Sequence, residues 1–471
     1  CILDSGTPIV QWNCQTHQLH LMEHTSPFVY PTNPYAPPGT TAVALQSNSI
    51  PLSQTSDFVL EYLGVGTNII TGSSLVELPY YPNTVGNFVL HLSPSIPQSN
   101  VTSGRNMVFL LDHSGSMSGE TMSSAKSALQ QAIQMLTPYD YFTICVFDHE
   151  MIWFQCPVNS LPFLCHANPQ TIQVACQWIE SIQASGLTNI LTPYQMATTL
   201  LSNPITQFPI QTYQPYGPPK IYPSNHENSI IFNLPIIFLI TDGAVENEIE
   251  ICNFAEKKYQ EKNPNIKIPT SIRTFSFGIG PYVNPYFLKT LSHNGRGYSE
   301  ICLHQELIST NIIELMRRTY CPQLTDITIE MPSNVKDVEI FPLPIPDLYA
   351  GYPVTIAGKY SGNFPAVLNV RGKTLSGMEI IVPVYVRLPY RPISLKQLFV
   401  TFYLDDLISN YWKNKSNPSI ANEYQKKASE VSCQTGVPCV FTKSVAYETR
   451  PCEPPNQIQE DTLELQQQQQ Q

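Results

Sequence analysis

The sequence predicts an α/β fold, in which a doubly wound, mostly parallel sheet is flanked by β-rich regions on both sides. Residues 107–111, 141–147 and 234–240 are continuous apolar runs, which are typical of strands buried on both faces. Helical patterns alternate with these runs, and such alternation favours a parallel sheet with helices on both faces. Shorter strand patterns, broken by Pro, Gly, Asn and Ser, occur before residue 101 and after residue 320.

The helices of the central block are predicted from apolar spacing. Met122, Ala125 and Leu129 recur three and four positions apart, which is the spacing of an amphipathic helix. The predicted helices cover residues 119–136, 171–182, 246–260 and 303–318, and a fourth strand covers residues 271–277.

Five regions are expected along the chain. They are a β-rich region over 1–100, the α/β domain over 101–320, a β-rich domain over 321–404, a helical closing segment over 405–450, and a disordered Gln-rich tail over 451–471. Candidate strands of the second β-rich part cover 325–331, 335–340, 366–370 and 379–386. The Pro-rich insertion at 204–223 joins a helix to a strand, so we expect it at the end of the sheet opposite the carboxyl ends of the strands.

Composition and charge limit the classes of function. With 42% hydrophobic and 13% charged residues, the chain is globular in class and its surface must rely on uncharged polar side chains. Its net charge of -11 argues against nonspecific nucleic-acid binding, which depends on basic residues at phosphates. No run of about 18 apolar residues is present, so no membrane span is expected. The chain starts at Cys1 rather than Met, which we interpret as a fragment or a processed chain.

Oxygen-bearing side chains follow the buried strands. Asp112, Ser114 and Ser116 alternate directly after the first strand, Thr188 lies on a loop before a helix, and Asp242 follows the third strand. The carboxyl ends of parallel strands share one end of a sheet, so these side chains are expected to converge there. Carboxylates and hydroxyls suit Mg²⁺, Mn²⁺ or Ca²⁺ and suit Zn²⁺ poorly. A set of two carboxylates and three hydroxyls favours a compact six-coordinate ion, Mg²⁺ (or Mn²⁺), over Ca²⁺.

The motif Asp112-x-Ser114-x-Ser116, with Thr188 and Asp242, resembles the metal-ion-dependent adhesion site of von Willebrand factor A domains. The resemblance covers roughly residues 101–320 and implies a Rossmann-like fold. It implies that Ser114, Ser116 and Thr188 bind the ion directly, while Asp112 and Asp242 often act through water. It also implies a protein partner that offers a Glu or Asp carboxylate to the ion. His113 departs from the small or apolar residue usual at its position.

A narrower resemblance is carried by residues 238–245, Phe-Leu-Ile-Thr-Asp-Gly-Ala-Val, and by Phe-Gly-Ile-Gly at 277–280. Both look like the inter-alpha-trypsin inhibitor heavy chain family, and the Cys252-Asn253 pair looks like its plant-type relatives. Residues 13–17, 57–62 and 433–438 resemble flanking segments of those proteins, so residues 1–100 are interpreted as the tail of a truncated vault/inter-alpha-trypsin-type domain. Animal members are secreted, but the plant-like relatives lack a signal peptide, so we expect an intracellular protein.

Three functions are weighed. A metal-dependent protein-interaction module without catalysis is favoured, because the ligand set is complete. A Mg²⁺-dependent hydrolase using Asp112 and Asp242 is less favoured, since no nucleophile–base pair can be named and Met117 breaks the G-x-S-x-G pattern. A structural scaffold with a vestigial metal site is the third. Ser114 and Ser116 could also simply cap the following helix.

Overall fold

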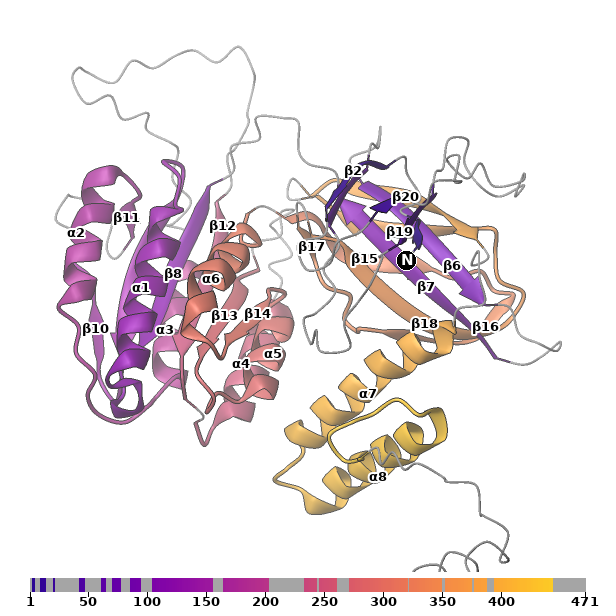
Figure 1. The fold of residues 1–471 in the computed structure, drawn as a ribbon. Helices are drawn as coiled ribbons and strands as arrows, with labels where there is room; N and C mark the ends of the chain where they lie inside the picture. Colours follow the sequence, from indigo (N-terminus) through magenta and orange to yellow (C-terminus); the bar gives the residue numbers. More distant parts are fainter. Residues whose placement is uncertain are drawn as a thin grey trace, which may run out of the picture.

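The computed structural model describes most of the chain from residue 104 to residue 443, together with shorter segments before it (Figure 1). The described ranges are 2–4, 9–13, 20–21, 42–46, 61–64, 70–77, 85–94, 104–155, 164–202, 233–243, 245–260, 271–320, 322–349, 352–374, 377–387 and 394–443. The insertion at 204–223 and the tail at 451–471 lie outside the described residues.

The central sheet is mostly parallel. Its order is β10-β9-β8-β12-β13-β14, with β11 pairing β9; β8, β9, β12, β13 and β14 run parallel, and β10 and β11 pair antiparallel with β9. Its strands are β8 (Arg105–Asp112), β9 (Tyr141–Phe147), β10 (Met151–Trp153), β11 (Cys165–His166), β12 (Leu234–Thr241), β13 (Arg273–Ile279) and β14 (Ser299–Cys302). Every residue of β8 and β12 is buried, as the continuous apolar runs predict.

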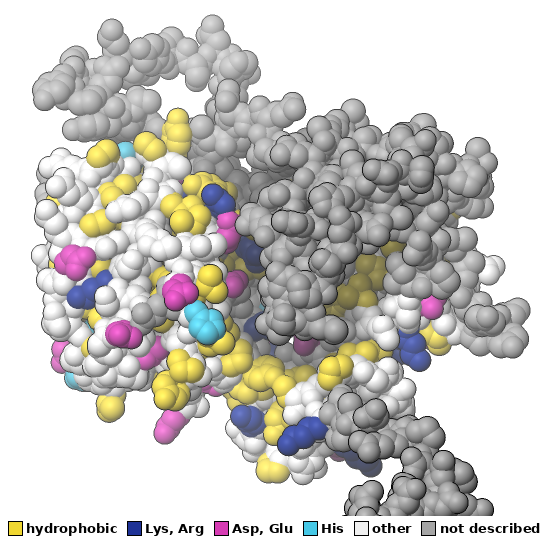
Figure 2. Space-filling model, in the orientation of Figure 1, with side chains coloured by type: hydrophobic (Ala, Val, Ile, Leu, Met, Phe, Trp, Pro, Cys, Tyr) yellow, Lys and Arg dark blue, Asp and Glu magenta, His cyan; other side chains and the backbone are white. Residues whose placement is uncertain are grey.

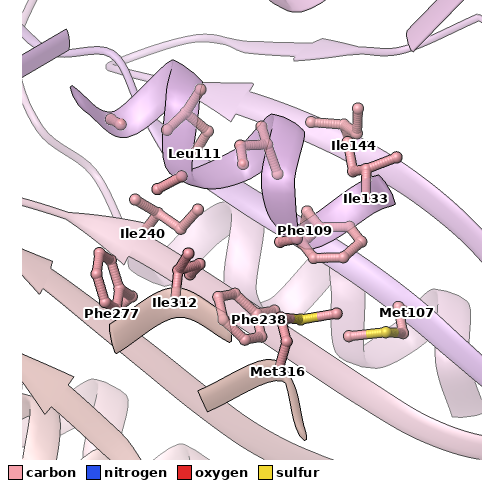
Figure 3. Packing of buried hydrophobic residues seen from close by; sticks show 14 of the residues in the cluster. Met107, Phe109, Leu111, Ile133, Ile144, Phe238, Ile240, Phe277, Ile312 and Met316 are labelled. Carbon is pink, nitrogen blue, oxygen red and sulfur yellow. The ribbon is translucent and has the colours of Figure 1, made fainter. Parts of the chain in front are cut away.

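Helices cover both faces of this sheet, so the predicted doubly wound α/β architecture is confirmed (Figure 1). One apolar core contains residues of α1, α2 and α6, and the other contains residues of α3, α4 and α5. In the first core, Phe109, Phe238 and Ile312 pack between the sheet and helices α1 and α6 (Figure 3). The helices are α1 (Glu120–Gln134), α2 (Pro169–Glu180), α3 (Leu191–Ser202), α4 (Glu248–Gln260), α5 (Pro285–Asn294) and α6 (Ile308–Arg317).

A second sheet combines strands that precede and strands that follow the α/β domain in the sequence. Its order is β16-β18-β7-β6-β20-β19-β15-β17. The strands are β6 (Ile70–Glu77), β7 (Gly86–Pro94), β15 (Pro322–Glu330), β16 (Val335–Phe341), β17 (Leu348–Tyr349), β18 (Val354–Gly362), β19 (Val367–Lys373) and β20 (Glu379–Arg387). Strands β6 and β7 thus lie in the middle of a sheet whose other strands come from residues 322–387, since β7 pairs with β18 and β6 with β20.

Two helices complete the described chain. Helix α7 (Leu395–Lys413) begins ten residues earlier than the helical segment expected from position 405, and α8 (Pro418–Thr435) follows it after a short break. The earlier start has a packing reason, because Leu395, Phe399 and Val400 are buried against the second sheet beside Val89 and Ala357.

The first 64 residues contribute short described strands only. These are β1 (Ile2–Asp4), β2 (Ile9–Asn13), β3 (His20–Leu21), β4 (Ala42–Gln46) and β5 (Glu61–Gly64). On the face shown in Figure 2, charged side chains are scattered among uncharged polar and apolar ones. No helix among the described residues is long and apolar enough to cross a membrane.

Candidate metal centre

The candidate site lies where the strand order reverses. Strand β8 has β9 on one side and β12 on the other, so the connections that follow β8 and β12 leave the sheet on opposite faces. In open α/β sheets, ligands bind in the crevice at the carboxyl ends of strands at such a point. Asp112 is the last residue of β8, and Asp242 directly follows β12.

Four of the predicted site residues share one hydrogen-bond network. Ser116 Oγ donates to Asp242 Oδ1 at 2.9 Å, and Ser114 Oγ lies 3.1 Å from Ser116 Oγ. The Ser114 amide donates to Asp112 Oδ1 at 2.9 Å. Two strand ends and the turn before α1 are therefore joined through side chains that the sequence places far apart.

Thr188 reaches the same place from the loop before α3. A Cβ atom built on Gly243 would lie 3.6 Å from Asp112 Oδ2 and 3.9 Å from Thr188 Cγ2. Both side chains therefore border the turn that follows Asp242.

The two serines do not cap the helix. The residue that precedes α1 is Gly119, and neither it nor Ser114, which precedes the short 3-10 turn Gly115–Met117, makes a side-chain cap hydrogen bond. The hydroxyls of Ser114 and Ser116 instead bond to each other and to Asp242. The capping alternative is therefore wrong.

Asp112 and Asp242 are both buried, and burial raises the pKa of each carboxyl group. Burial raises the pKa of Asp112, although hydrogen bonds from Ser114 and Thr241 and the nearby His113 lower it. Burial and the charge of Asp112 likewise raise the pKa of Asp242, against the hydrogen bond from Ser116. The ion pairs that lysine and arginine form in the described part of the chain involve other acids.

The donor set fits a hard divalent cation. Two carboxylates and two serine hydroxyls are joined by hydrogen bonds at the carboxyl end of the sheet, with Thr188 beside them. A cation would supply the positive charge that the buried acids lack. Across the described ranges, no three His, Cys, Asp or Glu side chains are grouped as a metal site. A site at this position would therefore depend on the oxygens of Ser114, Ser116 and Thr188.

Three neighbours surround the site, and two of them, Thr241 and Asp148, were missed by the sequence reasoning. Thr241 donates to Asp112 Oδ2 at 2.6 Å. Asp148, one residue beyond β9, hydrogen-bonds to the loop that carries Thr188. His113 is buried, and neither ring nitrogen has a hydrogen-bond partner. Asp148 could have been found by the rule applied to Asp112, because it too follows a buried parallel strand directly.

Comparison with known proteins agrees with this fold. A family model described as von Willebrand factor type A domain matches residues 105–206 and 235–301. The match covers most of the central α/β domain, which is therefore of the von Willebrand factor A type.

Its relatives include the inter-alpha-trypsin inhibitor heavy chains. The human inter-alpha-trypsin inhibitor heavy chain H4 is 27% identical over 300 residues, covering 62% of this chain and 27% of that protein. Human von Willebrand factor A domain-containing protein 5B1 is 26% identical over 288 residues, covering 60% of this chain and 20% of that protein. The matched part thus spans about a quarter or less of these relatives. A solved von Willebrand factor type A structure from Catenulispora acidiphila aligns over 79% of this chain and 89% of that one, at 13% identity and a TM-score of 0.48.

Proposed function

We propose that the chain is a divalent-metal-dependent protein-interaction module. Mg²⁺ (or Mn²⁺) would be held by Asp112, Ser114, Ser116, Thr188 and Asp242. The observation that carries this proposal is the pair of buried carboxylates, linked through serine hydroxyls, at the crevice where the strand order reverses. Relatives of the von Willebrand factor A type are generally interaction modules, which supports the same function.

The chemistry of the site follows from its own residues. The amide of Ser114 and the hydroxyl of Thr241 fix both oxygens of Asp112, and Ser116 orients Asp242. A bound ion would supply net positive charge and a free coordination position at the rim. The exposed side of Ser116 leaves that rim open to a partner, whose Glu or Asp carboxylate would meet it in a partly dry contact where charge-assisted bonds are strong.

We propose no catalysis at this site. Ser116 donates its proton to Asp242, while the two ring nitrogens of His113 have no hydrogen-bond partner, so the described residues offer no serine–histidine pair here. A serine nucleophile needs a general base within hydrogen-bond distance, and the base bonded to Ser116 is Asp242, which we assign to the metal. The hydrolase alternative is therefore less favoured, and the scaffold alternative is the one that experiment must separate.

The test is a pull-down from a native extract with wild type and Asp242→Ala, each with and without a chelator. The control is Glu246→Ala, which removes an exposed acid four residues further along the same connection. Partners should be retained only by wild type and the control, and only without chelator. Mg²⁺ should also raise the melting temperature of these two proteins, since ligands of the native state stabilise it. If partners are captured equally under every condition and Mg²⁺ does not raise the melting temperature, the chain is a structural scaffold with a vestigial metal site.

A further inference from the structure

The loop over residues 185–189, which carries Thr188, is attached at several points to the ends of strands β8 and β9. The Ser185 amide donates to the carbonyl of His113 at 2.7 Å, and the Gly115 amide donates to the carbonyl of Gly186 at 3.0 Å. On the other side, the Asn189 amide donates to the carbonyl of Asp148 at 2.9 Å. The loop is therefore held against the turn that carries Ser114 and Ser116.

The side chain of Asp148 completes this attachment. It is 4% exposed, and its Oδ1 accepts a hydrogen bond of 2.6 Å from the Glu150 amide. Its Oδ2 accepts a hydrogen bond of 3.2 Å from Ser185 Oγ, at the start of the loop. Burial would raise the pKa of Asp148, but the Glu150 amide, His113 and the Ser185 hydroxyl together hold it below the ordinary value. The carboxylate is thus ionised and bonded on both oxygens.

Gly186 allows the loop to lie directly on that carboxylate. Its φ is +73°, which favours glycine. A Cβ atom at this position would overlap Asp148 Oδ2 and would lie 2.6 Å from His149 Nδ1. Two requirements therefore coincide at residue 186, one from backbone conformation and one from close packing.

We propose that Asp148 and Gly186 are positioning residues for the metal site, which hold the loop so that Thr188 faces Asp112 and Asp242. The proposal rests on the proposed function, in which Thr188 is a ligand. Neither residue would touch the ion. Each acts through the loop, as residues behind the direct ligands generally do when they fix ligand orientation.

Gly186→Ala tests the proposal with Gly436→Ala as its matched control. Gly436 ends α8 with the same φ of +73° but has nothing within 4 Å of a built Cβ, so it carries the backbone strain without the collision. Both variants should melt at lower temperature. Only Gly186→Ala should weaken Mn²⁺ binding, by about 10- to 100-fold in titration calorimetry of the full chain. Only Gly186→Ala should speed amide hydrogen exchange over residues 185–189 without metal.

Asp148→Asn provides an independent arm. It keeps the size of the side chain but removes its charge, so the two charge-assisted hydrogen bonds become neutral and weaker. We expect the same two changes as for Gly186→Ala, of smaller size. Unchanged exchange over 185–189 in both variants would overturn the proposal, as would unchanged Mn²⁺ affinity in both. If wild type binds no Mn²⁺, the proposed function fails, and the positioning of Thr188 for a metal fails with it. Faster exchange over 185–189 in the variants would then show only that Asp148 and Gly186 attach the loop to the strand ends.

Discussion

The hydroxyl of Thr241 donates a hydrogen bond of 2.6 Å to Asp112 Oδ2 and so joins the last residues of strands β12 and β8. The hydroxyl oxygen of Thr241 also accepts a hydrogen bond of 3.1 Å from the Gly243 amide. One hydroxyl therefore fixes both the acid that ends β8 and the backbone that follows Asp242. Its removal should disturb the site from both sides.

Thr241→Val is expected to lower the affinity for Mg²⁺ by about tenfold, because outer-shell partners of metal ligands contribute on this scale. It should also lower the free energy of unfolding by about 1–3 kcal/mol, since a buried carboxylate oxygen loses its donor. Calorimetry and urea denaturation measure the two effects. An unchanged affinity with the stability loss present would show that Thr241 serves the fold alone.

The meeting of Asp112 and Asp242 at one end of the sheet could be predicted from sequence, because both follow continuous apolar runs that alternate with helices. The role of Thr241 could not, because it directly follows such a run and nothing in the pattern distinguishes it from the last residue of an ordinary strand. Its hydrogen bond depends on the register of β12 against β8, where Ile240 pairs with Leu111. Register between strands distant in sequence is not encoded in local spacing.

The metal preference is a second prediction. Mg²⁺ or Mn²⁺ should bind more tightly than Ca²⁺, because two carboxylates and three hydroxyls form a small set that suits an octahedral ion at about 2.1 Å. Ca²⁺ takes six to eight oxygens and would need additional carboxylates. Competition calorimetry on the full chain at constant ionic strength measures this order. Tighter binding of Ca²⁺ would contradict it.

Arg273 and Asp347 form an ion pair in which both side chains are 0% exposed, with Nη2 and Oδ2 3.0 Å apart. Arg273 begins β13 of the α/β domain, and Asp347 precedes β17 of the second sheet. Asp347→Ala should lower the free energy of unfolding by about 3–5 kcal/mol, because the buried arginine charge loses its carboxylate partner. The double variant Arg273→Met, Asp347→Leu should recover much of this loss. Equal losses in the single and double variants would show that the pair itself is not responsible.

The set of strands in the second sheet is a part of the fold that the sequence patterns did not predict. Strand patterns before residue 101 and over 379–386 are visible in the sequence, yet they predict two separate regions. Their assembly into one sheet depends on β6, which pairs with both β7 and β20 and was not predicted. Residues 70–77 mix Thr, Gly and Ser with apolar residues, so they show no clear strand pattern.

His293 should make stability depend on pH. Burial lowers its pKa to about 4, against the opposing hydrogen bond with the Leu343 carbonyl. The unfolded chain has an ordinary histidine pKa of about 6.5, so between these values it binds the proton more tightly than the folded chain does. The free energy of unfolding should therefore fall as the pH is lowered from about 6.5 to 4. Denaturation of His293→Gln at a series of pH values should show a weaker fall than wild type.

Trp412 connects the closing helices to the α/β domain. Its side chain is 3% exposed and belongs to the core formed with Ile251 of α4 and Phe287 of α5, while the start of the same helix packs on the second sheet. Helix α7 thus contributes to two cores at once.

Trp412→Ala should lower the free energy of unfolding by about 3–5 kcal/mol, because a large buried side chain is removed and a cavity remains. The control is Tyr411→Ala. The Tyr411 ring packs on Phe441, with the ring centroids 4.9 Å apart, and is not part of the core formed with α4 and α5. Hydrogen exchange should become faster in α4 and α5 for Trp412→Ala and should stay unchanged there for Tyr411→Ala. The physical reason is that only Trp412 shares a core with those helices. Equal exchange in the two variants would mean that α7 supports the second sheet without stabilising the α/β domain.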